Sequence, residues 1–212
     1  MNTLRNGLTT VVMAAFLGDY AHAAKGRRGK FRRAVRSLQE QTCNEWELII
    51  VCDGCEIAWN EATGFAREDE RVSVALLPKQ PQWSSALRNY GIVKAEGEFI
   101  TYLDTDDYFS REHIYNIRST FVNEPLTDWL FFDDFVFDVR TNSWRKRNCY
   151  RNRRHQCGTS NIAHRKSLGV YWPKDGYLHD WYFIKALEKK STAISSCLPG
   201  YYVCHIPQQY DV

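Results

Sequence analysis

The 212 residues suit a single domain, and a hydrophobic share of 44% is enough to bury a sizeable core. A net charge of +3 gives no reason to expect a nucleic-acid partner, and no apolar run reaches the ~18 residues that a transmembrane helix needs. Seven cysteines cannot all pair with one another. We therefore expect reduced thiols and a cytoplasmic compartment.

The first apolar run has two interpretations. Arg5, the apolar residues 8–17 and the segment Ala21-His22-Ala23 together look like a secretory signal with its cleavage site. Residues 9–16 also have the composition of a strand that is buried on both faces of a parallel sheet. We expect the buried strand.

The first half of the chain alternates between strand and helix patterns. This alternation is typical of an α/β fold with a mostly parallel sheet. The predicted elements are a strand over 9–16, a helix over 31–38, a strand over 46–51, a helix over 57–66, a strand over 72–77, a helix capped by Ser84 or Ser85 that runs to Ala95 and is stopped by Gly97, and a strand over 99–103.

The second half is less regular. We expect a helix that begins at Ser110, a strand-like stretch over 129–137, a short strand at 161–163, a helix over 180–190 and a last strand at 201–205. Asp133 and Asp134 interrupt the 129–137 stretch, so one of them should face solvent and the other a polar partner. The basic residues of 140–154 indicate a solvated hairpin or, alternatively, a surface that attracts an anionic acceptor.

Three carboxylates follow the predicted strand at 99–103. Asp104, Asp106 and Asp107 would repel one another in water, and a divalent cation that bridges to phosphates would relieve that repulsion. An acidic turn without a ligand is the alternative for a lone Asp-x-Asp. However, Asp53 and the loop 78–85 end two other predicted strands, so all three clusters should meet where such sheets bind ligands. We therefore predict a metal and diphosphate site, with Asp107 bonding within the turn.

Four motifs in this order resemble those of the GT-A glycosyltransferases, and within them the inverting family 2. They lie at 37–42 with 47–55, at 88–91, at 95–107 and at 176–181. The resemblance covers about 9–190. It implies one GT-A domain over 1–212, with a Rossmann-like, mostly parallel sheet flanked by helices. Residues 9–109 would form the nucleotide-sugar half, and 110–212 a smaller, mixed acceptor half.

The activity implied by the resemblance is that of a metal-dependent, inverting glycosyltransferase of the hexosyltransferase type. It would move a sugar from a nucleotide diphosphate sugar, with UDP favoured, to a hydroxyl of a glycan, lipid-linked or protein-linked acceptor. The cofactor would be Mn²⁺ or Mg²⁺ at a DXD motif. A sugar-nucleotidyl transferase and a non-catalytic nucleotide-sugar binding module are the alternatives.

The resemblance also implies roles for single residues. Asp180 would be the general base, although its position also fits a carboxylate that caps a helix or lies in its first turn. His205 is either a third metal ligand or a core histidine. The chain departs from the family motifs at Cys52, Cys55 and His179. The implied nucleotide-sugar contacts are Ala14, Ala15, Phe16, Asp53, Arg88, Asp104 and Thr105, and the implied metal ligands are Asp104, Asp106 and His205.

Overall fold

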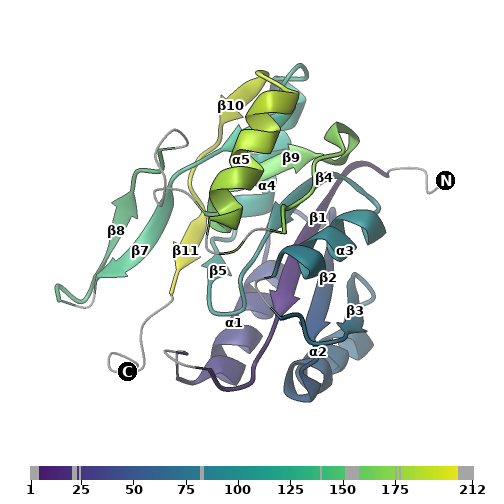
Figure 1. The fold of residues 1–212 in the computed structure, drawn as a ribbon. Helices are drawn as coiled ribbons and strands as arrows, with labels where there is room; N and C mark the ends of the chain where they lie inside the picture. The colour runs from purple at the N-terminus through teal and green to yellow at the C-terminus, as the bar shows by residue number, and fades with distance from the viewer. Residues whose placement is uncertain are drawn as a thin grey trace.

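A computed structural model of the chain describes residues 5–20, 23, 25–81, 84–138, 140–150, 158–174, 176 and 178–204. Its first half alternates strands and helices (Figure 1). These elements are β1 (Arg5–Ala15), α1 (Arg27–Gln39), β2 (Trp46–Asp53), α2 (Glu56–Glu68), β3 (Val72–Leu77), α3 (Ser85–Lys94) and β4 (Gly97–Tyr102).

The second half has shorter strands and two α-helices among its described residues. Its elements are β5 (Tyr108–Phe109), α4 (His113–Asn123), β6 (Trp129–Phe131), β7 (Asp134–Asp138), β8 (Ser143–Arg147), the 3₁₀ turn η1 (Thr159–Asn161), β9 (Ile162–Arg165), the 3₁₀ turn η2 (Lys166–Leu168), α5 (His179–Lys190), β10 (Ile194–Ser196) and β11 (Tyr201–Val203).

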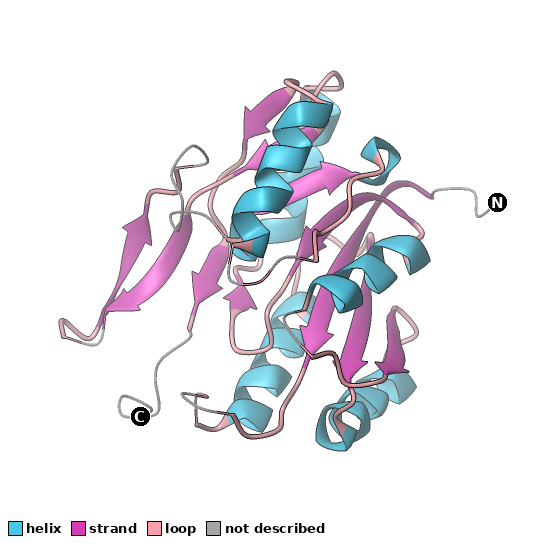
Figure 2. Cartoon of the chain, in the orientation of Figure 1, coloured by secondary structure: helices cyan, strands magenta, loops and turns pink. Residues whose placement is uncertain are grey.

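A seven-stranded sheet forms the centre of the molecule, in the order β10-β6-β9-β4-β1-β2-β3. The strands β4, β1, β2 and β3 are parallel neighbours, whereas β9 is antiparallel to β4 and to β6. A second sheet, β5-β11-β7-β8, projects to one side (Figure 2). The predicted α/β class with a mostly parallel sheet is therefore confirmed, and the second sheet belongs to the second half of the chain.

Both faces of the large sheet are covered by helices. Val11 and Met13 of β1 lie in one core with the apolar stripes of α1, α2 and α4, whereas Val12 faces the opposite way into a core with α3 and α5. All three side chains are at most 1% exposed. A strand whose alternate residues face two helical layers must be apolar throughout, which is why β1 reads as a continuous apolar run.

The boundaries of two elements differ from the prediction near Gly97. Gly97 does not stop α3, which ends at Lys94, but opens β4. A Cβ at this position would lie 2.6 Å from the Thr10 hydroxyl oxygen and 2.7 Å from the Leu8 carbonyl oxygen, so the glycine permits close approach of β4 to β1. Ser84 does occupy the N-cap position of α3, but its side chain makes no capping hydrogen bond.

The strand-like stretch over 129–137, which was expected to be interrupted at Asp133 and Asp134, forms two strands of different sheets. β6 belongs to the large sheet and β7 to the second one, and the chain changes sheets at Phe132 and Asp133. Asn161 fixes this change, since its side-chain amide donates to the Phe132 carbonyl at 2.9 Å and to Asp134 at 3.2 Å. Asp134 is fully buried against Arg147, and Asp133 pairs with Lys146 at 2.8 Å, which agrees with the expected division between the two aspartates.

Helix α4 begins at His113 and not at Ser110 as predicted. The Ser110 carbonyl accepts a hydrogen bond from the side chain of Gln41 at 2.6 Å, and the Gln41 side-chain oxygen accepts the Ile114 N–H at 2.9 Å. The glutamine at the end of α1 therefore takes over part of the capping of α4. Across the described residues, no helix is both long and apolar enough to cross a bilayer.

Candidate functional site

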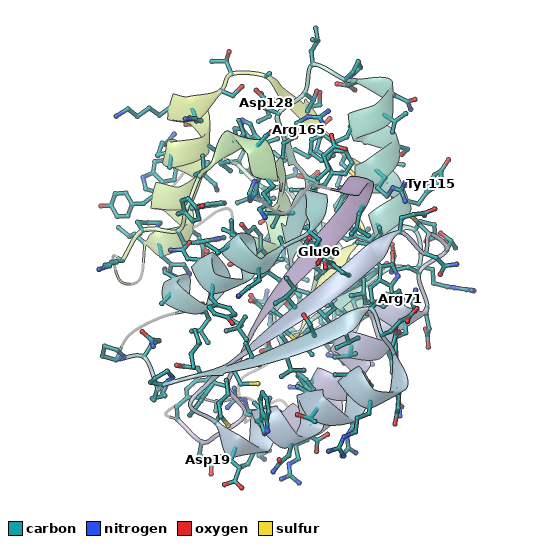
Figure 3. All side chains as sticks on the ribbon, turned by 90° about the vertical axis from the view of Figure 1, so that its right-hand side faces the viewer. Asp19, Arg71, Glu96, Tyr115, Asp128 and Arg165 are labelled. Atoms are coloured by element: carbon teal, nitrogen blue, oxygen red, sulfur yellow. The ribbon has the colours of Figure 1, made fainter. Side chains whose placement is uncertain are left out.

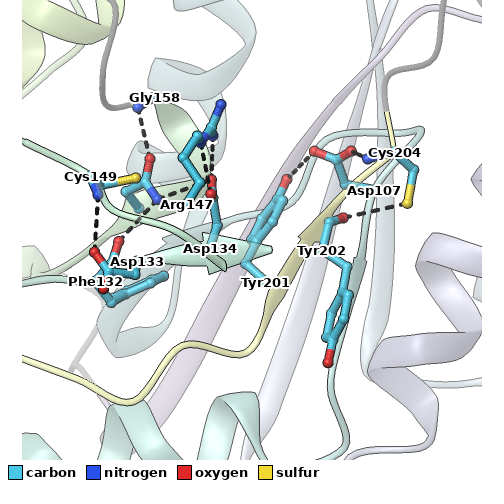
Figure 4. Close-up of polar contacts among 11 residues, drawn as sticks. Asp107, Phe132, Asp133, Asp134, Arg147, Cys149, Gly158, Tyr201, Tyr202 and Cys204 are labelled. Carbon is cyan, nitrogen blue, oxygen red and sulfur yellow. Dashed lines mark hydrogen bonds and ion pairs between the residues drawn. The ribbon is translucent and has the colours of Figure 1, made fainter. Parts of the chain in front are cut away.

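The acidic turn, residues 104–107, follows β4 at the carboxyl edge of the large sheet. Asp107 is buried and fully engaged by β11 (Figure 4). One of its oxygens accepts the Cys204 N–H at 2.6 Å and the other accepts the Tyr201 hydroxyl at 2.9 Å. The carboxylate of Asp107 is thus occupied by residues 201 and 204 from the far end of the chain, whereas its backbone N–H donates to the Asp104 carbonyl at 3.3 Å, a bond within the turn as predicted.

The Tyr201 hydroxyl also accepts the backbone N–H of Asp104 at 3.0 Å. One buried phenol thus holds both ends of the acidic turn. Burial raises the pKa of Tyr201 well above its ordinary value, and the nearby charges of Asp107 and Asp104 raise it further. The phenol consequently stays protonated and acts as a fixed hydrogen-bond donor to Asp107.

Arg88 of α3 connects the acidic turn to the segment that carries the predicted base. Its side chain is only 6% exposed, and its Nη2 lies 3.2 Å from Asp104 Oδ1. Its Nη1 lies 3.0 Å from His179 Nε2, and its guanidinium carbon is 4.6 Å from the centre of a Trp172 ring. A guanidinium between a carboxylate and an imidazole neutralises part of the negative charge that a phosphate-binding site concentrates.

Asp180 lies in the first turn of α5, next to His179. Its Oδ1 accepts the Thr159 hydroxyl at 2.9 Å and lies 3.2 Å from His179 Nε2. Burial works to raise the pKa of Asp180, but the His179 hydrogen bond and the positive charge of Arg88 outweigh it, so that the pKa lies below its ordinary value. The side chain is still 28% exposed, so an ionised carboxylate is accessible here.

Asp53 ends β2, two strands away from the acidic turn. It forms an ion pair with Lys79, and its Oδ1 accepts the Gln80 N–H at 2.7 Å, so the carboxylate holds the loop that follows β3. The Lys79 ammonium also lies 4.2 Å from the centre of the Phe16 ring. The ends of β1, β2 and β3 therefore meet at one corner of the sheet edge.

The donor set of the acidic turn fits a divalent cation. Burial raises the pKa of Asp104; Arg88 opposes this shift, and the negative charges of Asp106 and Asp180 add to it. Crowded carboxylates of this kind are relieved by a hard cation, and Mg²⁺ commonly takes one or two carboxylates together with substrate phosphates and water. Among the described residues there is no group of three or more His, Cys, Asp or Glu side chains placed to hold a metal.

The structure thus brings several predicted site residues together. Arg88, Asp104 and Asp180 share one network, and Thr105 lies within the acidic turn. Ala14 and Ala15 end β1, between Asp53 on one side and Asp104 on the other. His205 lies outside the described residues, as does part of the basic stretch 140–154.

Sequence reasoning missed four residues of this region: His179, Thr159, Tyr201 and Lys79. His179 carried a signal, because it replaces the glutamate of the motif that contains Asp180. Lys79 belongs to the loop 78–85 that was expected at this edge, although the residue itself was not singled out. Thr159 and Tyr201 had no signal, since they reach the site from segments with no motif of their own. Tyr201, for instance, lies 97 positions after Asp104.

A sequence profile named glycosyl transferase family 2 matches residues 23–180. The putative glycosyltransferase EpsH of Bacillus subtilis is 37% identical over 83 residues, which cover 39% of this chain and 24% of EpsH. A GalNAc(5)-diNAcBac-PP-undecaprenol beta-1,3-glucosyltransferase of Campylobacter jejuni is 28% identical over 82 residues, 38% of this chain and 26% of that protein. The matched part spans only about a quarter of each relative.

Solved structures agree over most of the chain. TarS 1–349 of S. aureus superposes with a TM-score of 0.73, covers 92% of this chain and 60% of its own, and is 16% identical. The mannosyltransferase PcManGT from Pyrobaculum calidifontis, solved with GDP-Man and Mn²⁺, superposes with a TM-score of 0.61, covers 90% of this chain and 56% of its own, and is 13% identical. Likeness at this level of identity shows a shared fold, the GT-A fold.

Proposed function

This chain belongs to glycosyl transferase family 2, and from that premise we propose that it transfers a sugar from a nucleotide diphosphate sugar to an acceptor hydroxyl, with inversion at the anomeric carbon. One observation carries the proposal. Arg88 contacts Asp104 of the acidic turn and also His179, which in turn contacts Asp180. A diphosphate-binding turn and an ionised carboxylate are the two groups that this reaction requires, and here they share one network.

The proposed reaction exchanges one bond for another. The acceptor oxygen attacks the anomeric carbon, while the bond from that carbon to the diphosphate oxygen breaks and its electron pair leaves with the diphosphate. Asp180 takes the proton of the attacking hydroxyl as general base, an effect worth ~10²–10⁴-fold in rate. A single base on the face opposite the leaving group gives inversion.

We further propose that Asp104 and Asp106 hold Mg²⁺ or Mn²⁺ together with the donor phosphates. A bound cation would supply Lewis-acid neutralisation of the departing diphosphate. Of the chain's own residues, Arg88 would add positive charge beside Asp104, and Tyr201 would keep the turn in one conformation through its bonds to Asp104 and Asp107.

For the donor, we propose that its base and ribose contact Ala14, Ala15, Phe16 and Asp53. We propose that the rest of the nucleotide sugar contacts Arg88 and Thr105. We favour UDP as the nucleotide. TarS has been solved with UDP-GlcNAc and with UDP, whereas PcManGT was solved with GDP-Man, so the fold accepts both bases and the preference needs measurement.

For the acceptor, we propose a glycan or a lipid-linked saccharide. The relative from C. jejuni is named for an undecaprenol-linked saccharide, which supports the lipid-linked form.

For the compartment, we propose the cytoplasm. The six described cysteines are free thiols, which supports this proposal.

The test is Asp180→Asn, which keeps the shape of the side chain and removes its charge. Binding of nucleotide sugars is measured by thermal shift with and without Mn²⁺, because a ligand of the folded state raises its apparent stability. Turnover is measured as release of nucleoside diphosphate. We expect wild-type binding of the donor and a loss of turnover on the order of 10²-fold or more.

Glu68→Gln is the matched control, since it changes an exposed carboxylate of α2 in the same way. It should leave binding and turnover unchanged. Unchanged turnover in Asp180→Asn would remove Asp180 from the mechanism. Release of pyrophosphate from a nucleoside triphosphate and a sugar phosphate would instead identify a nucleotidyl transferase.

A further inference from the structure

A groove of about 1000 Å³ lies between α1 and the second sheet, on the far side of the acidic turn from α3 and α5. We call it the α1 groove. One wall carries arginines of α1 and the other carries aromatic side chains of β5, β8 and β11. The residues that matter here are Arg32, Arg33 and Arg36, and Tyr108, Trp144 and Tyr202.

The aromatic wall is rigid because its rings hold one another. The rings of Tyr108 and Tyr202 are stacked, with centroids 4.8 Å apart and planes 4° from parallel. Trp144 meets both of them edge-on, at 5.8 Å and 5.0 Å. Phe135 stacks on Tyr202 at 4.8 Å, so the assembly is fixed from within the second sheet. Trp144 nevertheless remains 37% exposed, which leaves an aromatic surface open to a ligand.

The arginine wall differs from residue to residue. Arg32 is neutralised by two hydrogen bonds to Glu61, at 2.8 Å and 2.9 Å. Arg33 donates to the Asp106 carbonyl at 2.7 Å and lies 5.0 Å from the centre of the Tyr108 ring. Arg36 is exposed, and within the part of the chain that the structure describes its guanidinium has neither a hydrogen-bond nor an ion-pair partner. Two guanidinium groups are thus available beside the aromatic surface.

The charge of the groove lining changes along its length. Its other end carries Glu40 and Glu112 with Arg111, whose Nε lies 3.5 Å from the Glu40 carbonyl. Glu40, the C-cap of α1, lies seven positions after Arg33, roughly 10 Å along the helix axis, and Arg36 lies between the two. A bound molecule would therefore place an anionic group between Arg33 and Arg36 and neutral hydroxyl groups beyond them, beside Glu40.

We infer that the α1 groove is a binding site for an anionic saccharide, one that carries a carboxylate or a phosphate. A pyranose ring offers a face of C–H groups to an aromatic ring, and a guanidinium binds carboxylate or phosphate through paired hydrogen bonds. The binding needs no transfer reaction. Its role, to hold a distal part of an extended acceptor while the acceptor end reaches Asp180, rests on the proposed function.

Binding is tested by calorimetry on the full chain with four probes: trigalacturonate, maltotriose, inorganic phosphate and a short oligothymidylate. We expect trigalacturonate to bind at least tenfold more tightly than maltotriose or phosphate. Equal binding of maltotriose would show that charge plays no part, and equal binding of phosphate would show that the ring plays none. Tighter binding of the oligothymidylate would identify a nucleic-acid surface. Each of these three results would overturn the inference.

Two variants locate the site. Arg36→Gln and Trp144→Ala should each weaken trigalacturonate binding about tenfold, the size of one lost charge-assisted bond or one lost ring contact. Arg67→Gln, an exposed arginine in the last turn of α2, and Tyr115→Ala, an exposed ring on α4 (Figure 3), are the matched controls and should bind as the wild type does. Because the Arg36 guanidinium is exposed and has no hydrogen-bond or ion-pair partner among the described residues, its loss does not threaten folding.

The outcomes separate this inference from the proposed function. One outcome is that the chain binds trigalacturonate in an Arg36-dependent way and yet turns over no nucleotide sugar. That result would support the binding site and would remove its role as an acceptor subsite. Turnover without Arg36-dependent binding removes the site and leaves the transfer reaction intact. If Arg36→Gln abolishes self-association in sedimentation and leaves trigalacturonate binding unchanged, the groove is a contact between copies of the chain and the inference fails.

Discussion

His179 is held by a hydrogen-bond network that fixes the position of its protons. Its Nδ1 lies 3.0 Å from the Gly176 carbonyl, which can only accept, so Nδ1 carries a proton. In the neutral ring Nε2 is then an acceptor, and it faces the Arg88 donor at 3.0 Å. The same Nε2 lies 3.2 Å from Asp180 Oδ1. One imidazole nitrogen therefore lies next to both Arg88 and Asp180 and holds the two in one network.

Replacement of His179 should show whether the ring positions Arg88 and Asp180. His179→Ala removes the partner of both Arg88 and Asp180, and we expect kcat to fall roughly 10–100-fold, equivalent to ~1.4–2.7 kcal/mol, with donor affinity little changed. His179→Gln offers an oxygen to Arg88 and an N–H to Asp180 without any charge change. It should restore most of the rate.

Separate measurement of kcat and of donor affinity discriminates between the roles of His179. If the ring positions Arg88 and Asp180, kcat and donor affinity, measured separately at one pH, should separate: kcat falls in the alanine variant and recovers in the glutamine variant, while donor affinity stays the same in both. An alanine variant with the wild-type kcat, or a glutamine variant no faster than the alanine variant, would contradict this account.

Sequence reasoning located Asp104, Arg88 and Asp180 because each lies in a motif that survives in this chain. It could not assign His179, since the motif has glutamate at that position and the contact with Arg88 spans 91 positions of sequence. It placed a bond of Asp107 within the turn, which its backbone N–H makes to Asp104, but it did not foresee that the carboxylate is held by Tyr201 and Cys204. Contacts between distant segments leave no periodic pattern in a sequence.

At the scale of elements, α3 is positioned by its contact with β1. Gly91 is the point of closest approach, where an added Cβ would lie 2.4 Å from a methyl carbon of Val12. Val12 is 1% exposed and belongs to the core, so it has no space into which to move. Because Arg88 lies one turn earlier on the same helix, this contact also sets the position of the guanidinium in the site.

We expect Gly91→Ala to destabilise the protein by ~1–3 kcal/mol, since overpacking of the core outweighs the gain in helix propensity. It should also lower turnover, because a displaced α3 moves Arg88 away from Asp104. Denaturant unfolding and the transfer assay measure the two effects.

Gly64→Ala is the matched control on α2. No atom lies within 4 Å of its added Cβ, so the substitution should stabilise by ~0.5–1 kcal/mol and leave turnover unchanged. A stabilised and fully active Gly91→Ala variant would refute the role given to this contact.

The elements of the first half were predictable to within a few residues because strands and helices alternate there with clear apolar periods. The second half was not, for a topological reason. The apolar stretch 129–137 supplies strands to two different sheets, and the antiparallel strand β9 lies between β4 and β6. Asn161, which fixes the change of sheet, follows Thr159 and Ser160 in a segment without a motif and lies 29 and 27 positions from its two partners.

At the scale of the whole molecule, two buried histidines link folding to pH. Burial lowers the pKa of His113 from 6.5 to about 3 and that of His164 from 6.5 to about 4. Neither ring nitrogen of His113 has a hydrogen-bond partner among the described residues, whereas His164 bonds to the Tyr102 hydroxyl at 2.8 Å. Both rings are therefore neutral in the folded protein under mildly acidic conditions.

The contribution of these two histidines to the free energy of unfolding should fall as the pH decreases from about 6.5, to about 4 for His164 and to about 3 for His113. In those windows the unfolded chain binds protons that the folded chain excludes, at about 1.4 kcal/mol per pH unit for each histidine, whereas the raised pKa values of Asp104 and Asp107 act in the opposite direction. Chemical denaturation between pH 7 and pH 4 measures the slope. His113→Phe, which keeps a ring and removes the titrating group, should reduce it, and an unchanged slope would show that His113 does not contribute.

β11 has a consequence for synthesis of the chain. Tyr201 and Cys204 fasten the acidic turn at Asp104 and Asp107, nearly one hundred residues after the turn itself has left the ribosome. During translation the helices and parallel strands of the first half can assemble early. The acidic turn is fixed only after Tyr201 and Cys204 have been synthesised and can bond to it. A nascent polypeptide stalled before residue 200 should therefore display a folded, protease-resistant first half that has not yet gained its affinity for a nucleotide sugar.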